Sequence, residues 1–154
     1  MSRRPDILGE FTAEHRAVEE LLVRIEAGRA EDRAPGVLLD QLTDLLLSHC
    51  AAEEEHLFPV VQHDVPDGGA VVFRCIHDHL AIGQYLADLQ ALPSGDPAAL
   101  GTLLNGLTEL LRRHLATEEK QLFTVARKAL PAAERAALGE RVRADRADAA
   151  GAGP

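Results

Sequence analysis

The sequence of 154 residues contains no tryptophan, one tyrosine, four phenylalanines and two cysteines. Two cysteines are too few for a disulfide framework, so we expect a reducing compartment, the cytoplasm. No apolar run approaches the roughly 18 residues that a membrane-spanning helix needs. The opening segment MSRRPDILGEF has no apolar core of the kind that signal peptides carry. We therefore expect neither a membrane segment nor an export signal.

Positive charge is also scarce, with 16 Lys and Arg against 25 Asp and Glu, giving a formal net charge of -9. An acidic surface repels nucleic acid and anionic membranes, so neither is expected as a partner. Val and Ile do not gather into the alternating runs that predict strands. Ala, Leu, Glu and Arg favour helices instead. The composition therefore predicts an all-α protein.

Apolar residues recur at spacings of three and four along four stretches, which predicts four amphipathic helices. Turn-forming segments such as HDVPDGG and PSG separate them. Four such helices joined by short loops predict an up-and-down antiparallel four-helix bundle, which we assign to residues 1–130. In residues 131–154 we expect a short polar fifth helix from Ala132 to about Arg146 and a disordered tail, ADAAGAGP. The four bundle helices are expected at residues 6–27, 35–62, 70–92 and 97–130.

The segment SHCAAEEEHLF in the second predicted helix recurs as RHLATEEKQLF in the fourth. In this alignment His49 matches His114, and Glu53 matches Glu118. The spacing of four residues places an imidazole and a carboxylate one turn apart on the same helix face. The chain therefore reads as two helical hairpins that each contribute a His-x-x-x-Glu pair to the apolar face of a helix.

The repeat extends to the first and third predicted helices. His15 interrupts the apolar stripe of the first, and His79 interrupts that of the third. His15 precedes the first His-x-x-x-Glu pair by 34 residues, and His79 precedes the second by 35. Given a rise of about 1.5 Å per residue, the histidines of neighbouring helices lie at similar heights in the bundle. Two such hairpins about a pseudo-twofold axis would bring four imidazoles and two carboxylates into its middle.

Burying several unpaired imidazoles and carboxylates costs several kcal/mol, so the pattern predicts a metal site. In the alternative, a plain bundle with these residues facing outward, Leu and Val would be exposed instead. The absence of thiolates disfavours structural zinc, and six ligands suit two ions bridged by carboxylates better than one tetrahedral ion. Iron is the leading choice, with manganese and zinc behind it. The predicted ligands are His15, His49, Glu53, His79, His114 and Glu118.

This pattern, together with the EE-x-x-LFP ending from Glu53 to Pro59, resembles the hemerythrin-like (HHE cation-binding) family over about residues 6–130. The resemblance implies a four-helix bundle that holds two non-haem iron ions and a bridging oxo or hydroxo group. It implies that Glu53 and Glu118 bridge the ions and that the four histidines are terminal ligands. Its implied ligand is a small diatomic molecule or peroxide.

The sequence departs from hemerythrins proper, which have a fifth histidine in a His-x-x-x-His pair on the third helix. Here Cys75 lies four residues before His79 and Gly83 four residues after it. We hypothesise a vacancy on each iron, which suits reaction with O2, NO or peroxide, or sensing of these or of iron, better than reversible O2 carriage. Because no catalytic triad or nucleotide motif accompanies the metal pattern, whether the protein is an enzyme, such as a peroxidase, stays open.

Two further residues are candidate ligands. His56 follows Glu53 in a Glu-x-x-His spacing found in di-iron bundles, with a place at the bundle rim as the alternative. Cys75 lies one turn from His79, where a buried structural thiol is the alternative. Glu54 is either a hydrogen-bond partner for a ligand imidazole or a solvated carboxylate, as is its repeat partner Glu119. The functional alternatives are an iron store or iron sensor without catalysis, and a structural bundle that binds zinc or manganese.

Overall fold

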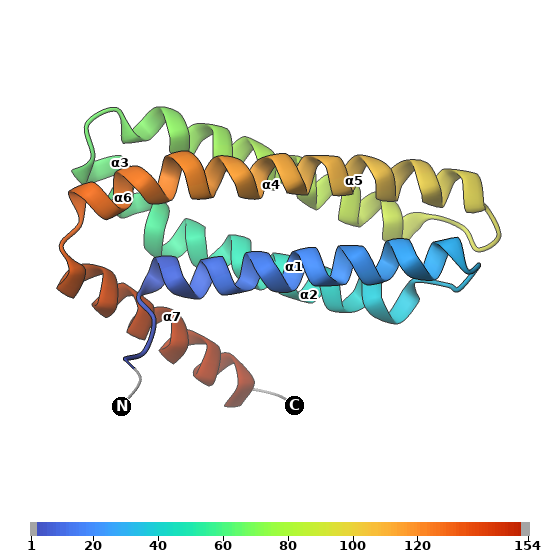
Figure 1. Cartoon of the computed structure of the whole chain (residues 1–154), viewed down its shortest axis with the longest axis horizontal. Helices are drawn as coiled ribbons and strands as arrows, with labels where there is room; N and C mark the ends of the chain where they lie inside the picture. Colours follow the sequence, from blue (N-terminus) through green and yellow to red (C-terminus); the bar gives the residue numbers. More distant parts are fainter. Residues whose placement is uncertain (1–2, 152–154) are drawn as a thin grey trace.

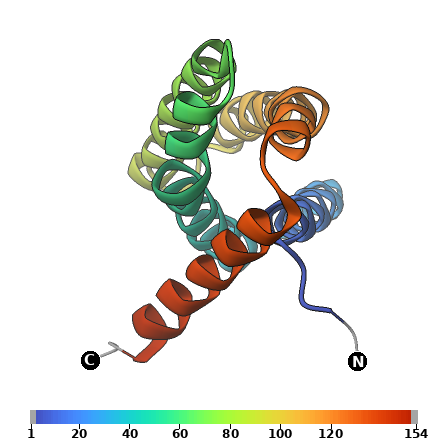
Figure 2. The same cartoon turned by 90° about the vertical axis from the view of Figure 1, so that its left-hand side faces the viewer.

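The computed structural model describes residues 3–151, which are helical apart from short connections and contain no strand. The all-α prediction is confirmed. Four long rods run side by side along the molecule, and a shorter helix crosses them near one end (Figures 1 and 2). Two of the rods change from α-helix to π-helix and back. In chain order the elements are α1 (Ile7–Ala30), α2 (Gly36–Ala52), η1 (Glu53–Leu57), α3 (Phe58–Asp64), α4 (Gly68–Ala91), α5 (Pro97–Thr117), η2 (Glu118–Leu122), α6 (Phe123–Ala129) and α7 (Ala132–Gly151). The four rods are α1, then α2 with η1 and α3, then α4, then α5 with η2 and α6, and the crossing helix is α7.

Side-chain caps set the starts of two rods. The Asp6 carboxylate accepts a hydrogen bond from the Gly9 N–H at 3.0 Å, and Asp96 accepts one from the Ala99 N–H at the same distance. Each satisfies one of the backbone donors that a helix start leaves free. Pro97 follows Asp96 at the first helical position, where its missing N–H costs nothing. Both starts agree with the sequence prediction.

The hydrophobic core is divided into two clusters. One lies toward the α7 end and contains Phe11, Phe58 and Phe123, which come from three different rods. The other fills the opposite half and is built largely of leucines, such as Leu42 and Leu107. Each apolar stripe is interrupted by a buried histidine, and two of the stripes also by a buried glutamate. The two apolar clusters are therefore separated by a buried polar layer, where the candidate site lies.

The two π-helices correct the predicted core face. The Phe58 N–H bonds to the Glu53 carbonyl, five residues back, and the Phe123 N–H bonds to Glu118 in the same way. A π-turn contains one residue more than an α-turn, so the inward face shifts by one position beyond it. The spacing of three and four that predicted the second helix puts His56 and Val60 on its core face. In the structure Leu57 is buried instead, and Val60 is only half-buried. In the second copy Leu122 is buried in place of Gln121, and Val125 is only half-buried.

The C-terminal helix α7 is longer than expected. It continues past Arg146 to Gly151, so residues 147–151 are helical rather than disordered, while residues 152–154 lie outside the described residues. It packs on α1 and η1 and buries Leu138 and Val142 in the cluster at this end. At Gly139 a Cβ would lie 3.0 Å from the Ile7 backbone nitrogen, so the glycine permits the close approach of α7 to α1.

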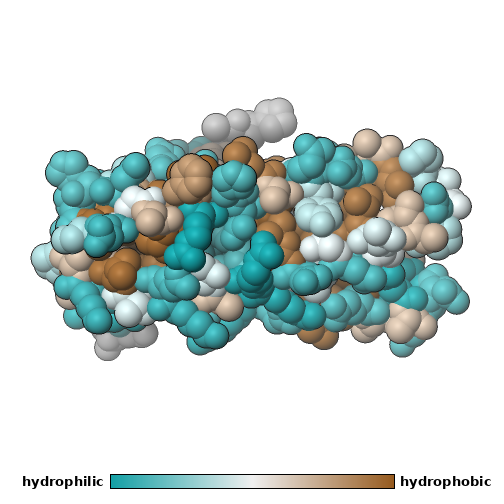
Figure 3. Space-filling view, turned by 90° about the horizontal axis from the view of Figure 1, so that it is seen from above, coloured by the Kyte–Doolittle hydropathy of each residue, from teal (hydrophilic) through white to brown (hydrophobic). Residues whose placement is uncertain are grey.

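Within residues 3–151 no helix is both long enough and apolar enough to cross a bilayer. The face seen in Figure 3 is mostly hydrophilic, with scattered hydrophobic side chains between the charged ones. This pattern agrees with amphipathic helices whose apolar stripes face one another.

Candidate metal centre

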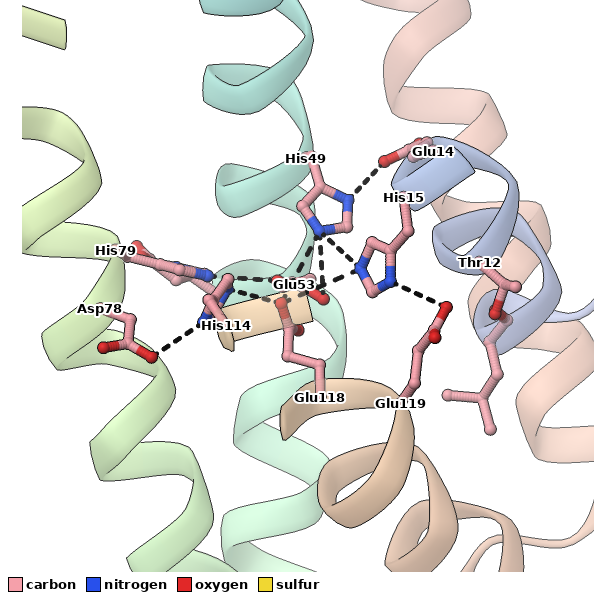
Figure 4. A network of polar contacts seen from close by, with 12 residues as sticks. Thr12, Glu14, His15, His49, Glu53, Asp78, His79, His114, Glu118 and Glu119 are labelled. Carbon is pink, nitrogen blue, oxygen red and sulfur yellow. Dashed lines mark hydrogen bonds and ion pairs between the residues drawn. The ribbon is translucent and has the colours of Figure 1, made fainter. Parts of the chain in front are cut away.

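Each of the four rods contributes one histidine to the polar layer, and the two π-helices contribute one glutamate each (Figure 4). Glu53 and Glu118 are the first residues of η1 and η2. Both glutamates are 0% exposed, and the four histidines are at most 7% exposed. The structure therefore brings all six predicted residues together. They are His15, His49, Glu53, His79, His114 and Glu118.

The six side chains form two groups that share both carboxylates. One group contains His15 and His49, the other His79 and His114, and each also includes Glu53 and Glu118 with its ligand atoms within 4.8 Å of one another. Glu53 spans the groups, because its Oε1 lies 3.4 Å from His49 Nε2 and its Oε2 lies 3.2 Å from His79 Nε2. Each of the two groups could therefore hold a metal ion.

Several inward-facing atoms have no hydrogen-bond partner, although they are shielded from water. They include both carboxylate oxygens of Glu53 and of Glu118 and the Nε2 atoms of His79 and His114. His114 Nε2 is 2.5 Å from Glu118 Oε1, but the two are not oriented for a hydrogen bond. Unpartnered buried polar atoms are costly. Imidazole nitrogens and carboxylate oxygens are the donors that bound cations use, so this donor set fits metal ions.

The outward-facing nitrogen of every one of these histidines meets a carboxylate. Nδ1 of His49 lies 2.6 Å from Glu14, and Nδ1 of His114 lies 3.1 Å from Asp78. With Nδ1–H donating to a carboxylate, each Nε2 is left as a lone-pair donor that points inward, as metal binding requires. The remaining two pairs are His15 with Glu119 at 3.2 Å and His79 with Glu54 at 2.8 Å.

The four supporting carboxylates follow the repeat. Glu54 and Glu119, each following an inward glutamate, support a histidine of the opposite hairpin, as the sequence analysis had considered. Glu14 and Asp78 support the histidine of the next rod and were not assigned a role from sequence. The signal was present, because an acidic residue immediately precedes both His15 and His79.

Residues 6–126 match the family described as the hemerythrin HHE cation binding domain. The chain belongs to this family. Neither a curated protein nor a solved structure matches the sequence. The match covers all six inward residues and ends before α7, which lies outside it.

Without a bound cation, the pKa values of the two inward carboxyls of the HHE domain are shifted in opposite directions. Burial and the adjacent Glu118 carboxylate raise the pKa of Glu53 well above its usual value of 4.5. Burial acts on Glu118 in the same sense, but contacts with Glu53 and His114 outweigh it and lower the pKa of Glu118. Glu53 thus favours its neutral form and Glu118 its charged form, as expected of two carboxyls in one dry site.

The pKa values of three of the imidazoles are also shifted, two downward and one upward. Burial lowers the pKa values of His15 and His79, so these rings are neutral near pH 7 and available to a cation. Burial would also lower the pKa of His114, but the carboxylates of Glu118 and Asp78 outweigh it and raise the value.

The two additional candidate ligands lie outside both groups. His56 turns toward α7, where its Nε2 is 2.6 Å from the Asp145 carboxylate and 3.9 Å from Glu55 near the surface. Cys75 lies in the hydrophobic cluster at the α7 end, and burial raises the pKa of its thiol to about 12. Gly83, on the other side of His79, is exposed. In the described structure, α4 thus brings only His79 to the two groups.

Proposed function

We propose that this HHE domain holds two iron ions in an up-and-down four-helix bundle and uses them to bind, sense or reductively handle O2, NO or peroxide. The observation that carries the proposal is the duplicated set of buried imidazole Nε2 atoms and carboxylate oxygens that face one another. Both carboxylates and the Nε2 atoms of His79 and His114 have no hydrogen-bond partner. Iron accepts this mixture of donors and supplies redox chemistry with such ligands.

Each ion would be held by three residues of one hairpin and by one glutamate of the other. His15 and His49 would serve one ion and His79 and His114 the other, with Glu53 and Glu118 shared between them. The outer carboxylates keep a proton on each Nδ1 and fix the orientation of each ring. The hydrophobic clusters on both sides of the polar layer exclude water from it.

The small number of protein donors favours reactivity over simple carriage. Two six-coordinate ions accept about twelve donor atoms, and the four imidazoles and two carboxylates supply fewer. Because Cys75 and Gly83 add nothing to the two groups, we propose that positions remain for a small exogenous ligand at both ions.

The test is to reduce the iron-loaded protein and mix it with O2 or with peroxide while recording absorption spectra. We expect oxidation of the iron within the mixing experiment and no stable, reversible oxygenated form. The Glu118→Gln variant, which alters a shared carboxylate, is expected to lose the reaction. A wild-type oxygenated spectrum that forms and disappears reversibly with O2 pressure would contradict the proposal of reactivity.

One observation favours iron sensing as a second candidate. Glu14 contacts both His49 and Arg146, so the added helix α7 is linked to the candidate metal centre through a single carboxylate. If bound ions fix the orientation of His49 and Glu14, they also stabilise the contact of Glu14 with Arg146 and hence the docking of α7. Faster amide hydrogen exchange in α7 after metal removal would support sensing, whereas identical exchange with and without metal would contradict it.

A further inference from the structure

Two grooves flank the candidate metal centre at positions that the internal repeat relates. The groove between α1 and α5 is a cavity of about 510 Å³ beside His15 and Glu119. The groove between α2 and α4 is about 240 Å³ and lies beside His79 and Glu54. Since His15 corresponds to His79 and Glu119 to Glu54, the grooves are equivalent faces of the duplicated fold.

The linings of the two grooves differ in chemistry. Arg16 and Arg112 line the α1–α5 groove, whereas Leu80 and Leu47 take the equivalent positions in the other. Arg127, on α6, adds a third guanidinium to the α1–α5 groove. In both grooves a carboxylate contacts Nδ1 of a histidine, Glu119 at His15 and Glu54 at His79. Because the α2–α4 groove has this contact without arginines, the arginines are not required for it.

The positive charge of the α1–α5 groove is only partly compensated. Arg112 pairs with Glu19 at 2.7 Å and with Glu26 at 3.4 Å. The Glu119 carboxylate faces His15 Nδ1, and Figure 4 shows Glu119 and Thr12 on the same side of His15. Within residues 3–151, Arg16 and Arg127 form no ion pair, so two unpaired guanidinium groups line one groove of a chain whose net charge is -9.

We propose that the α1–α5 groove binds a small dianion, a dicarboxylate or a phosphate-like oxyanion, between Arg16 and Arg127. Guanidinium groups hold such anions through paired, charge-assisted hydrogen bonds. A cavity of about 510 Å³ accommodates an anion of this size. The site lies beside the metal centre but is built from other residues, so it does not depend on the identity of the bound ion.

The experiment measures binding of malonate and of inorganic phosphate to the purified full chain by calorimetry, at constant ionic strength set with chloride. The test variant is Arg16→Gln with Arg127→Gln. The matched control is Arg24→Gln with Arg141→Gln, which removes the same charge at exposed positions outside the groove. We expect saturable binding of at least one anion, weakened roughly ten-fold or more in the test variant and nearly unchanged in the control.

Equal weakening in both variants would show a general charge effect and overturn the site, as would the absence of saturable binding to the wild type. Binding that survives in the test variant and changes the iron absorption spectrum would place the anion on the metal, which also overturns the site. Metal content is measured on the same samples. A chain without iron that still binds the anion through Arg16 and Arg127 would refute the di-iron proposal and support this one.

Discussion

Glu14 joins His49 of the candidate metal centre to Arg146 of the C-terminal helix. Its Oε2 lies 2.6 Å from His49 Nδ1, and its Oε1 contacts the Arg146 guanidinium. Both contacts outweigh the effect of burial and lower the pKa of the Glu14 carboxyl, which is therefore ionised. A helix beyond the family match thus reaches an imidazole of the candidate metal centre through one side chain.

Replacing Glu14 with alanine is expected to weaken metal binding by roughly 10–100-fold, because His49 loses the acceptor that fixes its ring and its Nδ1 proton. Titration with a divalent metal in competition with a chromophoric chelator measures the change. Glu20→Ala is the matched control, since Glu20 is an exposed residue of the same helix. Equal affinities in the two variants would show that Glu14 does not support His49.

Replacing Arg146 with glutamine is expected to loosen α7 while the four rods remain folded, because α7 loses its contact with Glu14. Hydrogen exchange of the amides of residues 132–151 should accelerate. Arg141→Gln, at an exposed position of the same helix, should leave the exchange unchanged. If α7 exchanges at the wild-type rate in both variants, its docking does not depend on the Glu14 contact.

Replacing Glu53 with glutamine should abolish metal binding yet stabilise the metal-free protein. The folded-state pKa of Glu53 is raised, so its contribution to stability is present below pH 4.5 and lost as the pH rises through that folded pKa. A neutral amide avoids this loss, so denaturant unfolding should show a gain of roughly 1–3 kcal/mol at pH 8 and less at pH 5.

Glu109→Gln provides the control for that comparison, because Glu109 is an exposed residue of α5. A metal-free Glu53→Gln protein that unfolds at lower denaturant concentration than the wild type at pH 8 would contradict the assignment of a costly buried carboxyl.

His56→Gln and Cys75→Ala are expected to retain the full metal content, since both side chains lie outside the two donor groups. The cysteine variant should lose roughly 1 kcal/mol of stability through a small cavity in the hydrophobic cluster at the α7 end. Elemental analysis and thermal unfolding measure the two effects. A loss of metal from either variant would add that residue to the centre.

The sequence predicted the helices and the six inward residues because each is a local pattern repeated in both hairpins. It did not predict the π-helices, since a straight helix places His56 and Val60 on the apolar stripe. A sign of the π-turn is the spacing of four from His49 through Glu53 and Leu57 to Val61. Each step of four advances about 40° beyond a full turn, so three steps accumulate roughly 120°, which an unbroken α-helix cannot keep on one face.

The roles of Glu14 and Asp78 depend on contacts between rods that no single helix pattern contains. The extent of α7 was also missed. Its weakly apolar sequence resembles a solvated segment, and its order comes from tertiary contacts such as the ion pair between Arg135 and Asp6 at 2.9 Å. Residues 147–151 were expected to be disordered because the tail was judged by its composition alone. In the structure they continue the helix that precedes them.

The number and identity of the metal ions per chain test the central claim most directly. Protein produced with iron is analysed for elemental content and for absorption in its oxidised and reduced states, alongside a His49→Ala, His114→Ala double variant. We expect two irons per wild-type chain, the bands of an oxo-bridged pair in the oxidised state, and loss of both from the variant. A wild-type chain that holds no iron, that takes up only zinc or manganese, or that keeps its metal when both histidines are removed would contradict the account.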